Sequence, residues 1–347
     1  MRVQVNARNR GYDFDARPGE KLLHAGLRSG IDLPYECSTG TCGTCKATLV
    51  SGRVTDAWRE APGKKYLKAD SAELLMCQCV AEEPVMLQVP KFVHPMDPGT
   101  CAPQANAGTL RRNRRLTNDV IAFTLELDRP CDFDAGQFVL LAPAGLAGFR
   151  AYSMCNFARG ARELEFVVKR KPEGRFCEWL FGGERERERL QVFGPLGKAV
   201  FDPALRKNIL CIAGGSGLAG MMSILARAAA EDYFERQSGW LYFGVRTLRE
   251  AFLLDELAAY ARRFAGKLSV TLALSEGDVP PGAQRERPEF AFARGLVHEV
   301  AKREMAGKYQ NLRAYVAGPP PAVDAAIRML LLDARLTTDN IRYDKYS

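Results

Sequence analysis

Four cysteines near the N-terminus constrain the fold of this chain more than any other feature. Cys37, Cys42 and Cys45 follow the spacing C-x4-C-x2-C, and Cys77 lies far downstream. Three ligands in one loop and a fourth from a distant segment are the thiolate spacing of a plant-type [2Fe–2S] cluster. The loop residues between the three cysteines are all serine, threonine or glycine, so main-chain N–H groups can approach the cluster sulfurs. The spacing therefore predicts an iron–sulfur domain that carries electrons.

Other interpretations of these cysteines compete with the cluster. A zinc site would need two close pairs of cysteine or histidine ligands, which this spacing does not offer. A cysteine-rich loop without metal is disfavoured by the spacing and the small loop residues together. Cys79 would share a strand face with Cys77 and could replace it as the fourth ligand, although we favour Cys77. The remaining cysteines follow no disulfide pattern, so we expect reduced thiols.

Length and composition bound the class of protein. A chain of 347 residues is expected to form two or three domains. No stretch approaches the ~18 apolar residues of a membrane span, and the first residues lack the apolar core of a secretory signal, so we expect a cytoplasmic protein without a membrane partner. The net charge of +8 is interleaved with acids, so we expect no nucleic-acid partner. A modest basic surface would suit an acidic redox partner.

Patterning divides the chain into three domains of a multidomain fold that combines α+β and α/β parts. Residues 1–92 are expected to form short strands and one helix around the cysteine loop. Residues 93–107 are rich in proline, alanine and glycine, as expected of an exposed linker. Residues 108–203 place strand-like segments between turns and predict an antiparallel β-barrel. Residues 204–347 alternate apolar strands with helices and predict a doubly wound α/β domain.

Two segments of the predicted barrel suggest a flat, anionic ligand. The string RAYSMCN, from Arg150 to Asn156, offers a cation, an aromatic ring and a hydroxyl at alternating positions, although such a string also occurs in ordinary strands. Gly174 precedes a predicted helix with Phe176 and Cys177, and a helix N-terminus of this kind can receive a phosphate. The two segments together favour a flavin.

The third domain contains a glycine-rich turn in a position that suits a dinucleotide. IAGGSGLAG, from Ile212 to Gly220, follows a predicted buried strand and opens a helix, where main-chain N–H groups can bind pyrophosphate. The acid expected at the end of the second strand is missing, and Arg246 stands there instead. Arg246 could favour the 2′-phosphate of NADPH or simply face solvent. A glycine turn that serves only packing is the alternative interpretation.

Two further features lie toward the C-terminus. AGPPP, from Ala317 to Pro321, is expected to form a rigid turn at the carboxyl edge of the sheet, where open α/β sheets bind ligands. Tyr346 can stack on a flat ring or belong to a loosely ordered tail.

Taken in order, these strings resemble the reductase components of bacterial multicomponent oxygenases, which are built from ferredoxin, FAD and NAD modules. PYECSTGTCGTCK with LLMCQC resembles the cluster motif, RAYSMCN the flavin motif, and GGSGLAG with AGPPP the nicotinamide motifs. WREAPG, residues 58–63, is similar to toluene monooxygenase reductases, which serve diiron hydroxylases. YFGVRT is similar to naphthalene dioxygenase reductases, which serve Rieske oxygenases, so the class of partner stays open.

The resemblance implies a fold and an activity. It implies a β-grasp ferredoxin domain, an FAD-binding barrel and a NAD-binding domain of the ferredoxin reductase type. Electrons would pass from NADH, rather than NADPH, through FAD and the [2Fe–2S] cluster to an oxygenase or its ferredoxin, and the chain would be a monomer by itself. A reductase of a separate ferredoxin and a redox-sensing iron–sulfur protein are the alternative functions.

The resemblance also assigns site residues. Ser153 and Tyr152 would be the catalytic residues beside the isoalloxazine ring, with Ser153 nearest its N5 atom, and Arg150 would bind an FAD phosphate. The other expected FAD contacts are Asn156, Val168, Lys169, Gly174, Arg175, Phe176 and Cys177. The expected contacts to the nicotinamide nucleotide are Gly214, Gly215, Ser216, Gly217, Arg246, Gly318, Pro319 and Pro320, and Tyr346 is expected to stack on the flat ring of a cofactor.

Three positions depart from the family pattern. Ser216 and Gly220 stand where relatives commonly have threonine and proline, and loss of the proline predicts a looser pyrophosphate loop. Ala317 stands where many relatives have a cysteine near the nicotinamide, so no thiol role is carried over. Cys177 replaces a serine or threonine near the FAD phosphate with a weaker hydrogen-bonding group.

Overall fold

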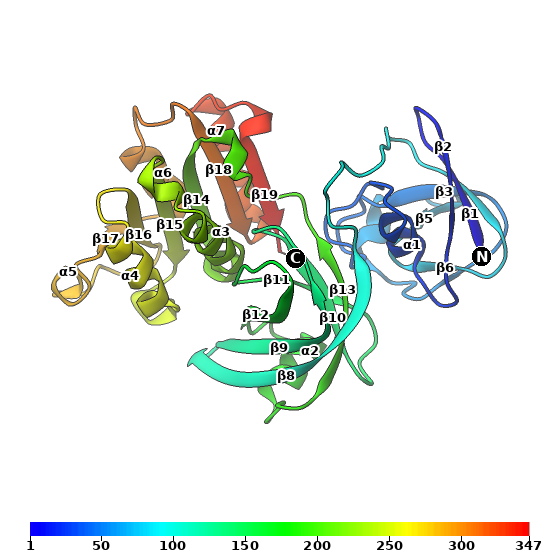
Figure 1. The fold of residues 1–347 in the computed structure, drawn as a ribbon, viewed down its shortest axis with the longest axis horizontal. Coiled ribbons are helices and arrows are strands. Elements are labelled where there is room, and N and C mark those ends of the chain that lie inside the picture. Colours follow the sequence, from blue (N-terminus) through cyan, green and yellow to red (C-terminus); the bar gives the residue numbers. More distant parts are fainter. Residues whose placement is uncertain (347) are drawn as a thin grey trace.

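The computed structural model describes residues 1–346 and contains three domains in chain order. Figure 1 shows the N-terminal domain in blue, the barrel in cyan and green, and the C-terminal α/β domain from green to red. This arrangement confirms the predicted fold class.

The N-terminal domain packs helix α1 (Leu22–Arg28) on a mixed sheet with strand order β2-β1-β7-β3-β5. Leu22, Leu23 and Leu27 are fully buried on the predicted helical face. The parallel pairing of β1 with β7 gives the sheet its β-grasp topology. Its strands are β1 (Arg2–Asn6), β2 (Gly11–Asp15), β3 (Lys46–Ser51), β5 (Glu73–Leu75) and β7 (Val85–Gln88), and a separate pair joins β4 (Val54–Asp56) to β6 (Cys79–Ala81).

The segment predicted to be a linker is bound to the N-terminal domain over its first part. Val93 is fully buried, and the Met96 N–H donates to the Gly30 carbonyl at 2.8 Å. The first strand of the barrel begins at Gln104, inside the range 93–107. The exposed part of this connection is therefore shorter than its composition suggested.

The middle domain is an antiparallel barrel with strand order β11-β10-β13-β8-β9-β12. The two end strands, β11 and β12, contact each other, so the sheet closes into a barrel. Along β12, Leu164, Phe166 and Val168 alternate toward the buried face. The elements are β8 (Gln104–Thr117), β9 (Val120–Cys131), β10 (Phe138–Pro143), β11 (Arg150–Ser153), β12 (Ala161–Lys169), β13 (Arg189–Leu196) and helix α2 (Arg175–Phe181).

The C-terminal domain is a parallel sheet with order β17-β16-β15-β14-β18-β19 and helices on both faces. The order reverses beside β14, so the loops after β14 and β18 meet at the carboxyl edge, where open sheets bind ligands. The strands are β14 (Asn208–Gly214), β15 (Gly239–Val245), β16 (Leu268–Leu274), β17 (Phe290–Arg294), β18 (Leu312–Gly318) and β19 (Ile341–Lys345). The helices are α3 (Leu218–Ala230), α4 (Leu254–Arg263), α5 (Ala283–Glu286), α6 (Val297–Glu304) and α7 (Pro320–Leu332).

The last described residues include a strand, so the interpretation of residues up to Tyr346 as a loosely ordered tail is wrong. Strand β19 pairs in parallel with β18, from Ala314↔Ile341 to Gly318↔Lys345. The Tyr346 N–H then donates to the Gly318 carbonyl at 3.0 Å. This pairing fixes the last described residues at the carboxyl edge of the sheet.

The N-terminal domain and the barrel share one apolar core. Phe138, Leu140, Phe193 and Leu196 of the barrel belong to the same buried cluster as the core of the N-terminal domain. A shared core of this kind holds two domains in one relative position. Within residues 1–346, no helix is both long enough and apolar enough to cross a membrane.

Candidate functional site

The cysteine loop runs between α1 and β3 with several N–H donors pointing toward its sulfurs. The N–H groups of Thr39, Thr41 and Cys42 each donate to Cys37 Sγ at 3.4 Å. Gly43 has a φ of +77°, a backbone conformation that favours glycine. Hydrogen bonds to the sulfurs are one means by which proteins stabilise and tune a cluster, so this environment fits an iron–sulfur group.

The four predicted ligands form two close pairs, Cys37 with Cys42 and Cys45 with Cys77. Hydrogen bonding from the Cys42 thiol lowers the pKa of Cys37 to about 4, and hydrogen bonding from Cys45 likewise lowers the pKa of Cys77. Among residues 1–346, no three His, Cys, Asp or Glu side chains converge as ligands of one ion. The two separate thiol pairs would supply two thiolates to each iron of a two-iron cluster, whereas a single zinc ion would need all four ligands around one point.

The segment WREAPG packs directly on this loop. The Gly63 N–H donates to the Gly40 carbonyl at 2.8 Å, and a Cβ on Gly63 would lie only 2.8 Å from the same oxygen. On the other side, Gln78 Nε2 donates to Cys77 Sγ at 3.4 Å. Cys79 lies on β6 without a close thiol partner, and burial raises its pKa to about 12. These contacts support Cys77, rather than Cys79, as the fourth ligand.

The flavin motif lies on β11 and the loop after it. Arg150 is half-buried and donates to the Phe149 carbonyl at 2.9 Å, and no carboxylate pairs with it in the described part of the chain. A half-buried guanidinium without a carboxylate partner fits a phosphate. The Tyr152 ring packs against Phe176, with the centroids 4.8 Å apart, and burial raises the pKa of Tyr152. Ser153 is buried beside the C-terminal domain.

Several residues predicted to bind FAD have side chains that are already hydrogen-bonded or packed within the barrel. Asn156 donates from Nδ2 to the Glu163 carbonyl at 2.9 Å and accepts at Oδ1 from the Glu165 N–H at 3.0 Å. Val168 and Phe176 lie in the barrel core. Contacts from these residues to a cofactor would therefore have to come from the main chain. Gly174 precedes α2, and Arg175 is exposed at its start.

Cys177 is buried and bonded to the main chain of the same barrel. Its Sγ accepts from the Lys171 N–H at 3.3 Å and donates to the Lys169 carbonyl at 3.7 Å. The thiol thus holds the turn after β12 in place. We assign it this local role instead of a hydrogen bond to phosphate.

An ion-pair network joins the barrel to the C-terminal domain. Lys169 Nζ contacts Glu250 Oε2 at 2.8 Å and Asp119 Oδ2 at 3.4 Å. Glu250 Oε1 also contacts Arg246 Nε at 2.8 Å. Lys169 and Arg246, predicted to bind different cofactors, therefore meet at one carboxylate.

The glycine turn after β14 leads directly into α3 and touches the turn after β18. A Cβ on Gly217 would lie 2.2 Å from the Ala317 carbonyl oxygen, and one on Gly318, which has a φ of +146°, would lie 2.9 Å from the Gly214 oxygen. Nothing lies within 4 Å of a Cβ built on Gly215. Two closely packed turns with an open main-chain surface fit a pyrophosphate. Ser216 belongs to this turn, Pro319 is the N-cap of α7, and Pro320 is the first residue of that helix.

The flavin motif meets the end of the chain at one hydrogen-bonded cluster. Ser153 Oγ lies 2.9 Å from the Tyr346 hydroxyl and donates to Asp344 Oδ2 at 3.4 Å. Ser153 and Tyr346, each predicted to contact a cofactor, are thus brought together across the domain boundary. Asp344 was not among the predicted site residues. The sequence signal that could have identified Asp344 is its spacing of two residues from Tyr346, which places both side chains on the same side of an extended chain.

We predict that Asp344→Asn stabilises the protein in a pH-dependent way. Burial raises the pKa of Asp344 to about 7, so between its ordinary value and pH 7 the folded state holds a proton that the unfolded state has lost. The unfolding free energy therefore falls as pH rises through that window, and the neutral amide avoids the loss. The gain should be roughly 2 to 4 kcal/mol at pH 8 and vanish near pH 4. Thermal midpoints at the two pH values check this; an equal gain at both would contradict it.

Three family models match successive parts of this chain. Residues 5–82 match the 2Fe-2S iron-sulfur cluster binding domain, residues 107–201 the oxidoreductase FAD-binding domain, and residues 211–328 the oxidoreductase NAD-binding domain. The ferredoxin--NAD(P)(+) reductase CarAd of Metapseudomonas resinovorans is 34% identical over 94% of this chain and 95% of its own. The ferredoxin--NAD(+) reductase component of the alkene monooxygenase system of Xanthobacter autotrophicus is 33% identical over 97% and 99%.

Solved structures show the same architecture. The ferredoxin reductase in carbazole 1,9a-dioxygenase is 30% identical, with a TM-score of 0.82 over 100% of this chain and 99% of that chain. The Amycolatopsis cytochrome P450 reductase GcoB is 27% identical, with a TM-score of 0.80 over 99% and 98%. The likeness therefore spans all three domains.

Proposed function

Because this chain belongs to the ferredoxin–NAD(P)⁺ reductases that combine iron–sulfur, FAD-binding and NAD-binding domains, we propose that it delivers electrons from NADH to the oxygenase of a multicomponent system. Relatives with such roles serve alkene, xylene/toluene and naphthalene oxygenation. One observation carries the proposal. The three candidate sites lie on domains in direct contact, through the shared core on one side and the Ser153–Tyr346 contact on the other.

The residues of the chain would bind and orient the cofactors, which supply the chemistry. Bound FAD accepts a hydride and releases electrons singly, and the cluster carries one electron at a time. Arg150 would hold an FAD phosphate, and the turn from Gly214 to Gly217 would hold the pyrophosphate of NADH. Tyr346 and Ser153 would cover the flavin ring and limit the access of water to it. Cys37, Cys42, Cys45 and Cys77 would hold the irons.

We propose NADH as the physiological donor because of the charges around Arg246. The guanidinium is paired with Glu250 at 2.8 Å, and Glu250 is only 17% exposed. A 2′-phosphate bound at Arg246 would approach this carboxylate and be repelled by it. NADH carries no such phosphate, so the same pair does not oppose it.

A separate ferredoxin is the second candidate acceptor, because two of the most similar relatives are named ferredoxin reductases. We further propose a monomer acting in the cytoplasm, where thiols stay reduced; all ten cysteines are free in the structure. The structural features of the cluster loop suit either acceptor.

The test uses holoprotein reconstituted without air with iron, sulfide and FAD. NADH should bleach the flavin absorbance and then the cluster absorbance, and the protein should reduce cytochrome c. Equal concentrations of NADPH should act at least about 10-fold more slowly. Adding a diiron hydroxylase, a Rieske oxygenase or a free ferredoxin identifies the acceptor. A colourless reconstituted protein, or flavin that NADH does not bleach, would refute the proposal.

A further inference from the structure

His24 connects the cysteine loop to the flavin-binding barrel. It lies on α1, is 5% exposed, and its Nε2 atom lies 3.2 Å from Ser38 Oγ. Ser38 directly follows Cys37 in the loop. The His24 ring also contacts the barrel. It stacks on Phe193 of β13, with the ring centroids 4.1 Å apart and an angle of 15° between the ring planes.

A second barrel residue completes the contact. The ring of Phe149 meets His24 edge-on, with centroids 6.0 Å apart and an angle of 70°. Phe149 immediately precedes Arg150, the first residue of the flavin motif. His24 is therefore in contact with residues adjacent to a predicted cluster ligand and to a predicted flavin ligand.

The local conformation explains why a histidine suits this position. Ser38 has a φ of +56°, which is uncommon for a residue other than glycine. The hydrogen bond to His24 holds the Ser38 side chain and so helps to keep the loop in this conformation. An apolar ring could fill the same space but could not make this bond. Burial lowers the pKa of His24 to about 4, so the ring is neutral at physiological pH and stacks without a buried charge.

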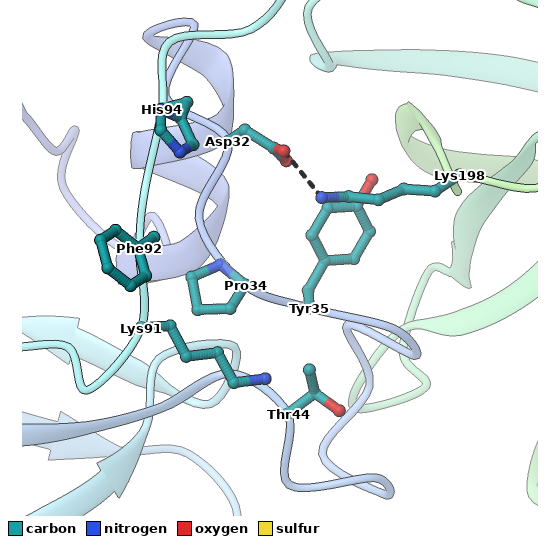
Figure 2. A pocket seen from close by; sticks show the side chains of 8 residues that line it. All are labelled: Asp32, Pro34, Tyr35, Thr44, Lys91, Phe92, His94 and Lys198. Atoms are coloured by element: carbon teal, nitrogen blue, oxygen red, sulfur yellow. Dashed lines mark hydrogen bonds and ion pairs between the residues drawn. The ribbon is translucent and has the colours of Figure 1, made fainter. Parts of the chain in front are cut away.

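Polar contacts surround this aromatic centre. The Gly197 N–H donates to the Tyr35 hydroxyl at 3.0 Å, and Lys198 pairs with Asp32 at 2.7 Å. Figure 2 shows Tyr35, Asp32 and Lys198 in a pocket of about 240 Å³ between the two domains. A buried aromatic centre with a polar rim is the usual arrangement of a stable protein interface.

We propose that His24 is a positioning residue that keeps the cysteine loop docked on the flavin-binding barrel, so that the iron–sulfur domain does not swing on its linker during turnover. This inference rests on the proposed function, since it concerns the step between the flavin and the cluster. In the proposed function, electrons would enter in pairs from NADH and would have to reach the cluster one at a time. A fixed contact sets the distance for that step, whereas a mobile domain would make it depend on collision.

The test compares His24→Ala with His24→Phe in the reconstituted holoprotein. Alanine removes both the stack and the hydrogen bond, whereas phenylalanine keeps the stack alone. With NADH as donor, ferricyanide reduction reports flavin reduction, and cytochrome c reduction reports passage through the cluster. For alanine, the ratio of cytochrome c to ferricyanide rates should fall at least about 10-fold, and a second calorimetric transition should appear for the freed N-terminal domain. Phenylalanine keeps the stack but loses the hydrogen bond to Ser38, so it should retain one transition and give a ratio between those of alanine and the wild type.

Two further variants keep the result decisive. Phe149→Ala removes the edge contact from a half-buried position, and should lower the same ratio by a smaller factor while its FAD absorbance stays at the wild-type level. His94→Ala changes an exposed histidine at the same interdomain pocket and should leave both readouts unchanged. A wild-type ratio and a single transition in His24→Ala would overturn the inference. Failure of the proposed function would look different, because the wild-type protein itself would then not reduce cytochrome c.

Discussion

Cys45→Ser is expected to eliminate cytochrome c reduction while NADH still reduces the flavin. Cys45 is 2% exposed and lies against Cys77, so the two residues would together hold one of the irons. Serine oxygen is a poor replacement for a thiolate ligand, and the cluster should not be retained. We expect NADH-dependent cytochrome c reduction to fall at least about 100-fold and ferricyanide reduction to change less than about two-fold. Stopped-flow absorbance and iron analysis of the same preparation measure both effects.

Cys79→Ser is the matched control for this substitution. Cys79 is equally buried, at 1% exposure, but its thiol has no close thiol partner and burial keeps it protonated. Iron content and cytochrome c reduction should therefore stay near wild type in this variant. Unchanged cytochrome c reduction in Cys45→Ser would contradict the proposed electron route. Loss of iron in Cys79→Ser together with its retention in Cys77→Ser would make Cys79 the fourth ligand.

Much of the fold could be predicted because its determinants are local in the sequence. The apolar strands of the C-terminal domain are buried on both faces of a parallel sheet, so they appear as short continuous apolar runs. The strand Asn208–Gly214 and the following glycine turn are an example, and both lie where the pattern placed them. Strand β19 is different, because three of the five residues in its sequence IRYDK are charged and its strand form depends on pairing with β18.

The parts of the site that could not be predicted depend on contacts between distant segments. Asp344 and Ser153 are 191 residues apart, and only the folded topology brings β11 to the carboxyl edge of the sheet. Lys169 and Glu250 belong to different domains, so nothing local indicated that this lysine is paired. The stack of His24 on Phe193 is of the same kind. Residue type and spacing therefore identified which ligands the domains bind, whereas the contacts between domains required the structure.

Gly217→Ala is expected to lower kcat/KM for NADH by about 100-fold, because a displacement of about 1 Å at a binding turn can cost that much. Gly217 has an ordinary helical φ of −56°, so the added methyl group acts only through the 2.2 Å approach to the Ala317 carbonyl, which forces the turns after β14 and β18 apart. Gly220→Ala, three residues farther along in the first turn of α3, is the control, because its Cβ would make only ordinary contacts, the nearest of them with Ser153 Cβ at 3.8 Å. Alanine in a helix interior is more stable than glycine by about 1 kcal/mol, so this control should fold well and turn over NADH normally.

Steady-state kinetics with ferricyanide, together with flavin reduction by dithionite, separates loss of NADH binding from loss of FAD. Equal losses in both variants, or none in Gly217→Ala, would remove the basis for placing the pyrophosphate at this turn.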